Sequence, residues 1–295
     1  MSAPLLSLLA ALSFALSNVA LYRGTRTAST RAAVLLSVFL GVPFFLVAAG
    51  ATGELREVPL TAAALFAAGG VIHFVVGRSF LWAAIGMIGA SRAVVFTSLS
   101  PVFALALAVV LLEESINALT LVGAALVISG PVVASRPAVT ADAGVRAAAP
   151  RWTRGMTLAL LGAICWGFSP IVIKAALDRT DAVIMGTLIS YAGAACVLAV
   201  RAAASDKLEP FRSLDRNSLK WFVVAALGTN IAQFLNYAAL SRGDVAIVVV
   251  LLQITPILVA GLTYLVSREI ERVTTGVVVG GLLAVVGSIL VVSST

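Results

Sequence analysis

Ten apolar stretches follow one another along the chain, and short polar segments separate them. They cover residues 4–22, 32–50, 60–85, 93–112, 118–134, 155–177, 182–200, 219–240, 245–266 and 273–292. Each is close to the roughly 20 residues that an α-helix needs to cross ~30 Å of hydrocarbon. The pattern therefore predicts an all-α membrane protein with ten transmembrane helices.

The first five stretches resemble the last five in the order of their polar and small residues. Three segments and two pairs of glycines align: 11–18 with 163–170, 81–84 with 236–239, 98–101 with 253–256, and Gly123 and Gly130 with Gly280 and Gly287. Because each half has five spans, the second half enters the membrane from the opposite face. We therefore predict two inverted five-helix repeats. Internal symmetry of this kind is typical of secondary transporters, whose substrate sites lie between the repeats near the bilayer midplane.

The repeat divides the chain into two domains and a connection. Residues 1–134 are the first five-helix repeat and residues 154–295 the second. Residues 135–153 lose the apolar pattern and are rich in Pro, Arg and Ala, which is typical of a linker.

Composition excludes a water-soluble domain. The 295 residues are 61% hydrophobic and 11% charged, and the mean hydropathy is +1.09, so the lipid bilayer is the expected surrounding. The net charge of +7 does not indicate nucleic-acid binding, because the basic residues are dispersed among short loops beside the spans. Most of them follow odd-numbered spans, whereas the opposite loops hold only Arg56, Arg179 and Arg242. The positive-inside rule then predicts a multi-pass protein of the cytoplasmic (inner) membrane with both termini on the non-cytoplasmic side.

Several motifs recur in a specific order. They are Cys-Trp-Gly-Phe-Ser-Pro at 165–170 with Lys174 in the sixth span, Pro101 and Pro256 in the fourth and ninth, and acidic residues (Glu113 and Glu114, then Glu269 or Glu271) before the glycine-rich fifth and tenth. In this order the chain resembles the drug/metabolite transporter superfamily, and within it the ten-helix EamA-type branch. The first span departs from the pattern, with Phe14-Ala15 in place of Trp-Gly and Tyr22 in place of Lys. The resemblance implies a solute carrier, often an exporter of amino acids or other small metabolites, with a central cavity lined by both halves.

Polar residues within the spans are the candidates for that cavity, because polar groups in hydrocarbon are costly and usually face a protein interior or a watery space. In the eighth span, Asn230, Gln233 and Tyr237 lie at intervals of three and four and share one helical face. The repeat pairs Gln233 and Tyr237 with Arg78 and Trp82 of the third span. Further candidates are Ser13, Ser17, Asn18, Trp166 and Ser169 on spans one and six, and Ser98 and Gln253 on spans four and nine. The alternative for each is an interhelical hydrogen bond, which contributes about 0.6 kcal/mol on average.

Arg78 is the sharpest candidate, because a guanidinium does not lose its charge and every carboxylate of the sequence lies in a loop or at the end of a span. We predict that it meets a carboxylate or another anionic group of the solute. The alternative is that it reaches an interface or bonds to backbone carbonyls. His73, the single histidine, is a candidate for proton coupling, with a packed histidine as the alternative. In a regular α-helix it lies about 140° around the axis from Arg78.

Pro101 and Pro256 each remove a backbone hydrogen bond within a span, and their symmetric positions predict hinges. Gly276 and Gly280 form a Gly-x-x-x-Gly face, which indicates either packing within the bundle or a homodimer contact.

The sequence therefore predicts a secondary transporter. We expect an exporter of a small metabolite, such as an amino acid or a related carboxylate-bearing solute, that works by alternating access between the repeats. A channel or a non-transporting scaffold or sensor is the alternative. The sequence shows no metal-ligand cluster, phosphate loop or nucleophile motif, so we expect no enzyme activity, no catalytic residue, no metal and no cofactor.

Overall fold

The computed structural model describes residues 1–103, 118–134, 149–203, 214–243, 245–266 and 273–293. Regular structure in these segments is helical. The helices are α1 (Ala3–Gly24), α2 (Thr30–Thr52), α3 (Leu60–Gly70), η1 (Val71–Gly77), α4 (Arg78–Ile88), α5 (Ala90–Thr97), α7 (Ala118–Ala134), α9 (Ala149–Leu177), α10 (Val183–Ala203), α12 (Arg216–Leu240), α13 (Val245–Leu252), α14 (Thr255–Val266) and α15 (Thr275–Ser293).

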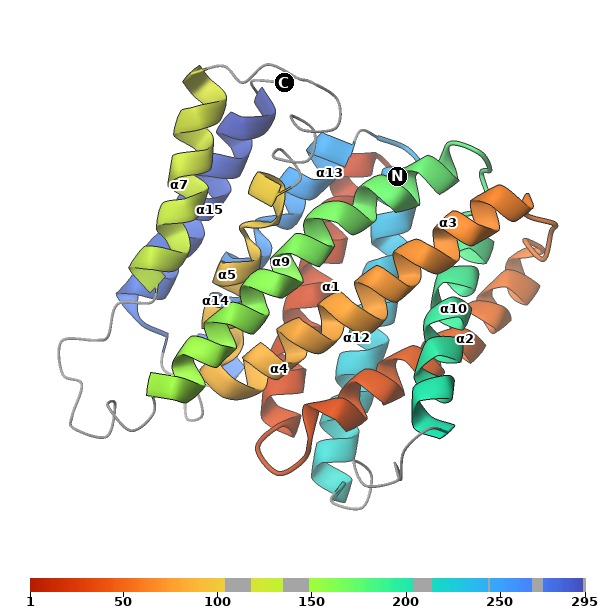
Figure 1. The fold of residues 1–295 in the computed structure, drawn as a ribbon, viewed down its shortest axis with the longest axis horizontal. Coiled ribbons are helices and arrows are strands. Elements are labelled where there is room, and N and C mark those ends of the chain that lie inside the picture. The colour runs from red at the N-terminus through yellow and green to blue at the C-terminus, as the bar shows by residue number, and fades with distance from the viewer. Residues whose placement is uncertain (104–117, 135–148, 204–213, 244, 267–272, 294–295) are drawn as a thin grey trace.

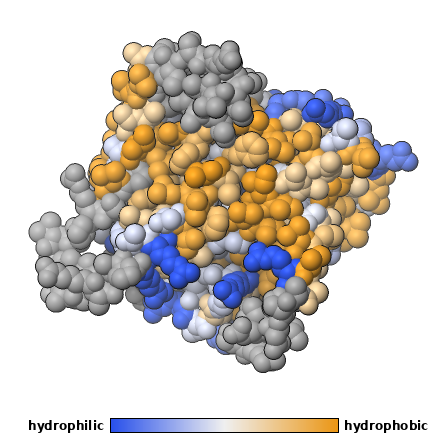
Figure 2. Space-filling view, in the orientation of Figure 1, coloured by the Kyte–Doolittle hydropathy of each residue, from blue (hydrophilic) through white to orange (hydrophobic). Residues whose placement is uncertain are grey.

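The predicted all-α, multi-pass fold is confirmed. Within the described residues, six helices are long and apolar enough to cross a membrane, the third of them being α3, η1 and α4 joined end to end, and the apolar parts of α7, α14 and α15 are shorter. The second part of the fourth predicted span, residues 104–112, lies outside the described residues. Hydrophobic side chains form a broad band across the middle of the molecule, and hydrophilic ones gather at its ends (Figure 2). This is the distribution that a lipid bilayer requires of a bundle.

Helices of one half pack mainly against helices of the other. α1 lies along α12, α7 along α15, α3 along α10, and α4 along α9. The two termini lie at the same end of the bundle (Figure 1), as an even number of crossings requires. The surface between the halves therefore runs through the centre of the molecule.

The fourth and ninth spans are interrupted at matching positions. α5 ends at Thr97 and the helix resumes at Ser100, while α13 ends at Leu252 and α14 begins at Thr255. Pro101 and Pro256 are the second residues of the resumed helices, a position where the missing N–H would have had no helical partner in any case. The interruption therefore precedes each proline, and the chain is broken there rather than kinked inside a continuous helix. The hinge role of the two prolines stays a prediction.

The third span contains a π-helical segment, η1. The backbone N–H of Arg78 donates to the carbonyl of His73, five residues earlier, whereas an α-helix would use the carbonyl four residues earlier. His73 and Arg78 are therefore one wide turn apart, and the angle expected for a regular α-helix does not apply. The repeat-related helix α12 is a continuous α-helix, so the two halves differ at this point.

Glycines let α7 and α15 approach closely. A Cβ on Gly130 would lie 2.5 Å from the carbonyl oxygen of Gly280, and a Cβ on Gly287 would lie 2.6 Å from that of Gly123. A Cβ on Gly276 would likewise lie 2.9 Å from the carbonyl oxygen of Val133. The Gly-x-x-x-Gly face of α15 thus packs within the chain. A homodimer stays a prediction.

Candidate functional site

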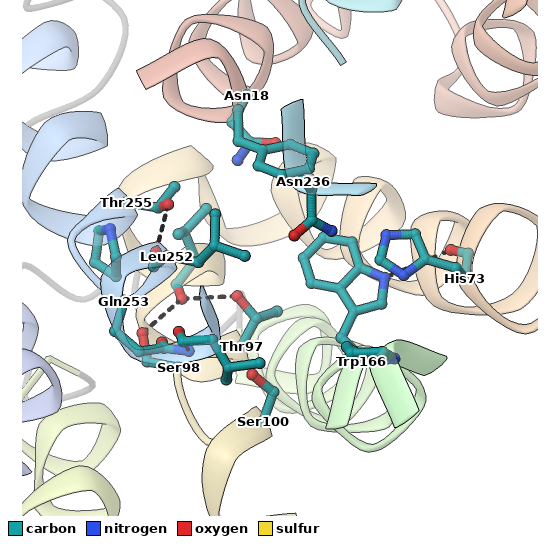
Figure 3. Close-up of a pocket in the computed structure, with 15 residues that line it drawn as sticks. Asn18, His73, Thr97, Ser98, Ser100, Trp166, Asn236, Leu252, Gln253 and Thr255 are labelled. Atoms are coloured by element: carbon teal, nitrogen blue, oxygen red, sulfur yellow. Dashed lines mark hydrogen bonds between the residues drawn. The ribbon is translucent and has the colours of Figure 1, made fainter. Parts of the chain in front are cut away.

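A cavity lies between the two halves of the chain, and Figure 3 shows residues that line it. The empty space amounts to about 660 Å³, part of it open to the surroundings. Residues from α1, η1, α5, α9, α12, α13 and α14 and from the two helix interruptions line it: Phe14, Asn18, His73, Val94, Thr97, Ser98, Ser100, Trp166, Pro170, Asn236, Val249, Leu252, Gln253, Thr255 and Pro256.

Apart from His73, the residues that line the cavity carry no ionisable side chain. Two basic residues of the spans, Lys174 and Arg78, have other contacts. Lys174 forms an ion pair with Asp178 at 2.9 Å and donates to the backbone carbonyl of Leu240 at 3.2 Å. Arg78 lies outside the lining, in the network described below. The cavity is therefore a polar space without a fixed ionic partner.

One wall of the cavity is a stacked pair of rings. The imidazole of His73 lies 5.2 Å from the indole of Trp166, centroid to centroid, with 15° between the ring planes. Nδ1 of His73 is 2.7 Å from Oγ of Ser169, and Nε1 of Trp166 donates to the carbonyl of His73 at 3.4 Å. A Cβ on Gly77 would lie 2.7 Å from Nε1 of Trp166. Gly77, the last residue of the π-helix, thus lets the indole pack against the third span.

The opposite wall is built from the two helix interruptions. The hydroxyls of Thr97 and Ser98 donate to the carbonyl of Val94 at 2.8 and 3.3 Å. The hydroxyl of Thr255 donates to the carbonyl of Leu252 at 2.6 Å, and Nε2 of Gln253 donates to the carbonyl of Val249 at 3.3 Å. These bonds bring side-chain donors to carbonyls near the ends of α5 and α13. The oxygens of these hydroxyl and amide side chains remain on the lining of the cavity.

Asn236, from α12, lies between the two walls. Its Nδ2 donates to Oε1 of Gln233 at 3.4 Å, and its Oδ1 has no hydrogen-bond partner among the described residues. The side chain is only 4% exposed, and its oxygen is on the side facing the interruption of the ninth span (Figure 3). A buried acceptor without a partner is costly, and a bound solute is one way to satisfy it.

A second group of polar residues is sealed within the bundle. We call Ser37, Arg78, Tyr191 and Asn230 the Arg78 network. Arg78 is 2% exposed, and its Nη1 and Nη2 each donate at 3.0 Å, to Oγ of Ser37 and to the hydroxyl of Tyr191. Its guanidinium carbon also lies 4.7 Å from the ring centroid of Phe74. Among the described residues, the partners that hold this charge are hydroxyls and aromatic faces rather than carboxylates.

Asn230 completes the Arg78 network. With its amide nitrogen toward Tyr191, it donates to that hydroxyl at 2.7 Å and accepts from the backbone N–H of Gly41 at 3.3 Å. Nearby, the hydroxyl of Tyr237 donates to Oγ of Ser190 at 2.9 Å. These bonds join α2, α4, α10 and α12. They are the interhelical hydrogen bonds considered as the alternative to solute binding.

The residues predicted from sequence fall into three groups. Those that line the cavity are Asn18, Ser98, Trp166 and Gln253, together with His73 and Pro256. Ser169 and Gln233 bond to lining residues. The others lie outside the lining: Arg78, Asn230, Tyr237 and Ser17 bond across helices, the ring of Trp82 is 5.6 Å from the Arg78 guanidinium carbon, and Ser13 and Pro101 complete this group. The roles of all of them in binding stay predictions.

Sequence reasoning missed several lining residues. The repeat itself contains a signal for two of them, because Ser100 and Thr255 occupy equivalent places in the aligned segments 98–101 and 253–256. Thr97 and Asn236 have apolar counterparts, Leu252 and Leu81, and symmetry alone does not find them. The apolar lining residues carry no signal of their own.

Comparison with solved structures supports the fold. Twenty-three chains match. One of them, titled only as the crystal structure of a protein, has a TM-score of 0.64 and is 18% identical, and the alignment covers 98% of this chain and 95% of that one. No curated protein matches.

A family model assigns the chain more specifically. The model described as the EamA-like transporter family matches residues 1–136 and 153–293. The two matched stretches together include every residue that lines the cavity. The chain belongs to the EamA-like transporter family.

Proposed function

We propose that the protein is a secondary transporter that exports a small metabolite through the central cavity by alternating access. The observation that carries the proposal is the pair of interrupted helices, whose breaks at 98–99 and 253–254 both meet the cavity. Irregular backbone at membrane depth is tolerated where it is buried in protein or lines a cavity. In secondary transporters, discontinuous helices at the repeat interface form the substrate site.

The symmetry of the interruptions favours a moving carrier over a fixed pore. Each half contributes one broken span to the same cavity, so that rocking one half against the other alters access from the two faces around a common site. Continuous helices such as α1 and α12 pack along each other between the halves and serve as rigid elements in this motion. A channel or a scaffold would not need two equivalent breaks.

We also propose that the protein resides in the cytoplasmic membrane with both termini on the non-cytoplasmic side. The support is the distribution of charge. Basic residues 23 and 26 lie at and just after the end of α1, and Arg151 and Arg154 lie in the first turns of α9, at the end of the bundle opposite the termini (Figure 1). Basic residues are enriched on the cytoplasmic side of membrane proteins.

Counterflow in proteoliposomes tests the transport proposal. Purified protein is reconstituted, and labelled amino acids, purines and organic acids are screened for uptake into vesicles loaded with the same unlabelled solute. We expect at least one solute to show saturable uptake that the internal solute accelerates. Trp166→Ala should reduce this uptake, because it removes one wall of the cavity. Leu265→Ala is the matched control, because that side chain is 77% exposed on α14, away from the lining.

The two alternatives give different results. A channel would produce flux that rises linearly with concentration and does not respond to internal solute. A scaffold or sensor would move no solute in the panel above the rate of empty vesicles.

A further inference from the structure

The hydrogen bonds that the lining residues already make indicate which kind of solute the cavity can bind. At five polar side chains of the lining, a donor is already bonded to protein: Thr97, Ser98, Asn236, Gln253 and Thr255. A hydroxyl has one donor and two acceptor lone pairs, and an amide has one acceptor oxygen beside its N–H groups. These residues therefore still offer their oxygen acceptors to a solute, and each of the two amides keeps one N–H besides.

Asn236 is the strongest single case. Its Oδ1 has no partner among the described residues and lies on the cavity side (Figure 3), while its Nδ2 donates to Gln233. An acceptor buried without a partner costs about 1–3 kcal/mol. A solute N–H placed against Oδ1 would remove that cost.

The charge of the lining limits the solute further. The lining has no carboxylate to balance a cation and no Lys or Arg to balance an anion, and His73, which is held by Ser169, is its one ionisable residue. Burying an ion without a partner is far more costly than burying a neutral polar group. The Arg78 guanidinium does not supply the partner, because Ser37 and Tyr191 bind it and it is 2% exposed. An anion would also face the acceptor oxygens of the two interruptions.

The shape of the remaining wall indicates a flat solute. The imidazole and indole rings of His73 and Trp166 stack nearly parallel, at 15°, and both line the cavity. Aromatic rings prefer offset-stacked or edge-to-face partners at centroid distances of 4.5–7 Å. A planar ring can continue this stack while its edge reaches the acceptors of Asn236 and Gln253.

We propose that the cavity binds an uncharged, planar solute that carries N–H donors on its edge, rather than a carboxylate-bearing solute. This inference rests on the proposed function, because it names the solute class of the same cavity. The sequence predicted both a transporter and a solute carboxylate bound by Arg78. The inference keeps the first prediction and replaces the second.

Three small molecules of the same size test the inference, because they differ mainly in charge: benzamide, benzamidinium and benzoate. Binding of each to the purified wild-type protein is measured by ligand-observed NMR titration in detergent micelles. We expect benzamide to bind at least about tenfold more tightly than benzoate or benzamidinium, the factor that corresponds to one well-made buried hydrogen bond. Preference for benzoate or for benzamidinium overturns the proposal, and so does absence of binding by all three.

Two variants locate the contact. Asn236→Leu removes the free acceptor and should weaken benzamide about tenfold without a new charge. Asn236→Asp supplies a carboxylate and should shift preference toward benzamidinium. If the Asp variant does not fold, the Leu variant still decides, and unchanged benzamide affinity in it overturns the proposal. Ser129→Ala is the control, because that hydroxyl bonds to the carbonyl of Leu126 within α7, outside the cavity.

The outcome for binding is distinguishable from the outcome for transport. Saturable counterflow of a solute together with preferential benzoate binding would keep the transporter and overturn the solute class. Benzamide binding without flux of any solute would keep the cavity chemistry and overturn transport.

Discussion

The cavity and the Arg78 network both contain hydroxyl and amide side chains, yet they differ in where their hydrogen bonds go. In the Arg78 network, side chains bond across helices, as Arg78 does to Ser37 and Tyr191. At the cavity, Thr97 and Thr255 bond to carbonyls of their own chain segment three residues earlier. The first pattern joins helices, whereas the second leaves acceptors facing a space. The direction of the hydrogen bonds thus distinguishes the Arg78 network from the cavity wall formed by the interruptions.

The difference has a physical cause in the helices themselves. A continuous helix satisfies its own backbone, so its polar side chains need partners on neighbouring helices. An interrupted helix has carbonyls and N–H groups without helical partners, and nearby hydroxyls bond to them first. The interruptions at 98–99 and 253–254 thus produce the acceptor-rich wall.

The largest effect should come from removing the charge at the centre of the Arg78 network. Arg78→Ala loses two hydrogen bonds to a charged group, each worth roughly 1.5–3 kcal/mol, so we expect the free energy of unfolding to fall by about 3 kcal/mol or more. Unfolding of purified protein in mixed micelles measures it.

Arg242→Ala is the control, because among the described residues that exposed side chain bonds to the carbonyl of Ala238, four residues earlier. A companion variant, Arg78→Gln, tests the carboxylate prediction. If it folds and loses flux of carboxylate solutes alone, then Arg78 binds solute and the contrast drawn between the two regions is wrong.

Two asparagines on α12 give the most direct comparison. Asn230→Leu removes three interhelical hydrogen bonds, which at ~0.6 kcal/mol each should cost about 2 kcal/mol. Asn236→Leu removes a buried oxygen without a partner, which costs about 1–3 kcal/mol, and a single long bond worth about 1 kcal/mol, so we expect its stability to equal or exceed that of wild type. Both are compared by the same unfolding measurement. Equal losses in the two variants would show that Asn236 is a packing residue.

Forcing the backbones of α3 and α10 apart should have a smaller but clear effect on stability. A Cβ on Gly70 would lie 2.2 Å from the carbonyl oxygen of Ser190, so Gly70→Ala must separate α3 from α10 and cost at least about 1 kcal/mol. The control is Gly261→Ala on α14, where nothing lies within 4 Å of the added atom. Thermal denaturation of the two variants and of the wild type measures the difference in stability. A Gly70→Ala protein as stable as Gly261→Ala would contradict the packing of α3 on α10.

The smallest effect should come from a comparable hydrogen-bond cluster at the water-exposed end. Asp215 caps α12 by accepting from the N–H of Ser218 at 3.0 Å and from the hydroxyl of Thr27 at 3.1 Å. Hydrogen bonds from the Ser218 hydroxyl and N–H hold the pKa of this carboxyl below its usual value of 3.8.

Because the pKa is lower in the folded state, the contribution is present above the ordinary carboxyl pKa and is lost as the pH falls through the folded value. Asp215→Ala should therefore be slightly less stable than wild type at neutral pH, and the two should converge in strong acid. A difference in melting temperature that does not change with pH would contradict this assignment.

The sequence predicted the architecture well, because hydrophobic length determines what crosses a membrane. The third predicted stretch, 60–85, corresponds to α3, η1 and α4, and the ninth, 245–266, to α13 and α14. The matching prolines at 101 and 256 also indicated where the fourth and ninth spans would be irregular. The hydrophobic length of each stretch and the positions of the prolines were sufficient to predict these features.

The division of polar residues between the cavity and the Arg78 network could not be predicted. Asn230, Gln233 and Tyr237 share a helical face, but only neighbours on α2 and α10 determine that Asn230 and Tyr237 are bonded. Tyr191 and Ser37, which hold Arg78, are far from it in the sequence and have no motif. Such contacts depend on three-dimensional packing rather than on periodicity.

The wide turn at 71–77 means that the third and eighth spans are not residue-for-residue equivalents along their whole length. A π turn holds one more residue than an α turn, which is how a single inserted amino acid is accommodated without rotating the rest of a helix by about 100°. An alignment of the two repeats without a gap there would place every residue on one side of η1 on the wrong face. Duplicated halves can therefore diverge in length inside a membrane while both ends keep their neighbours.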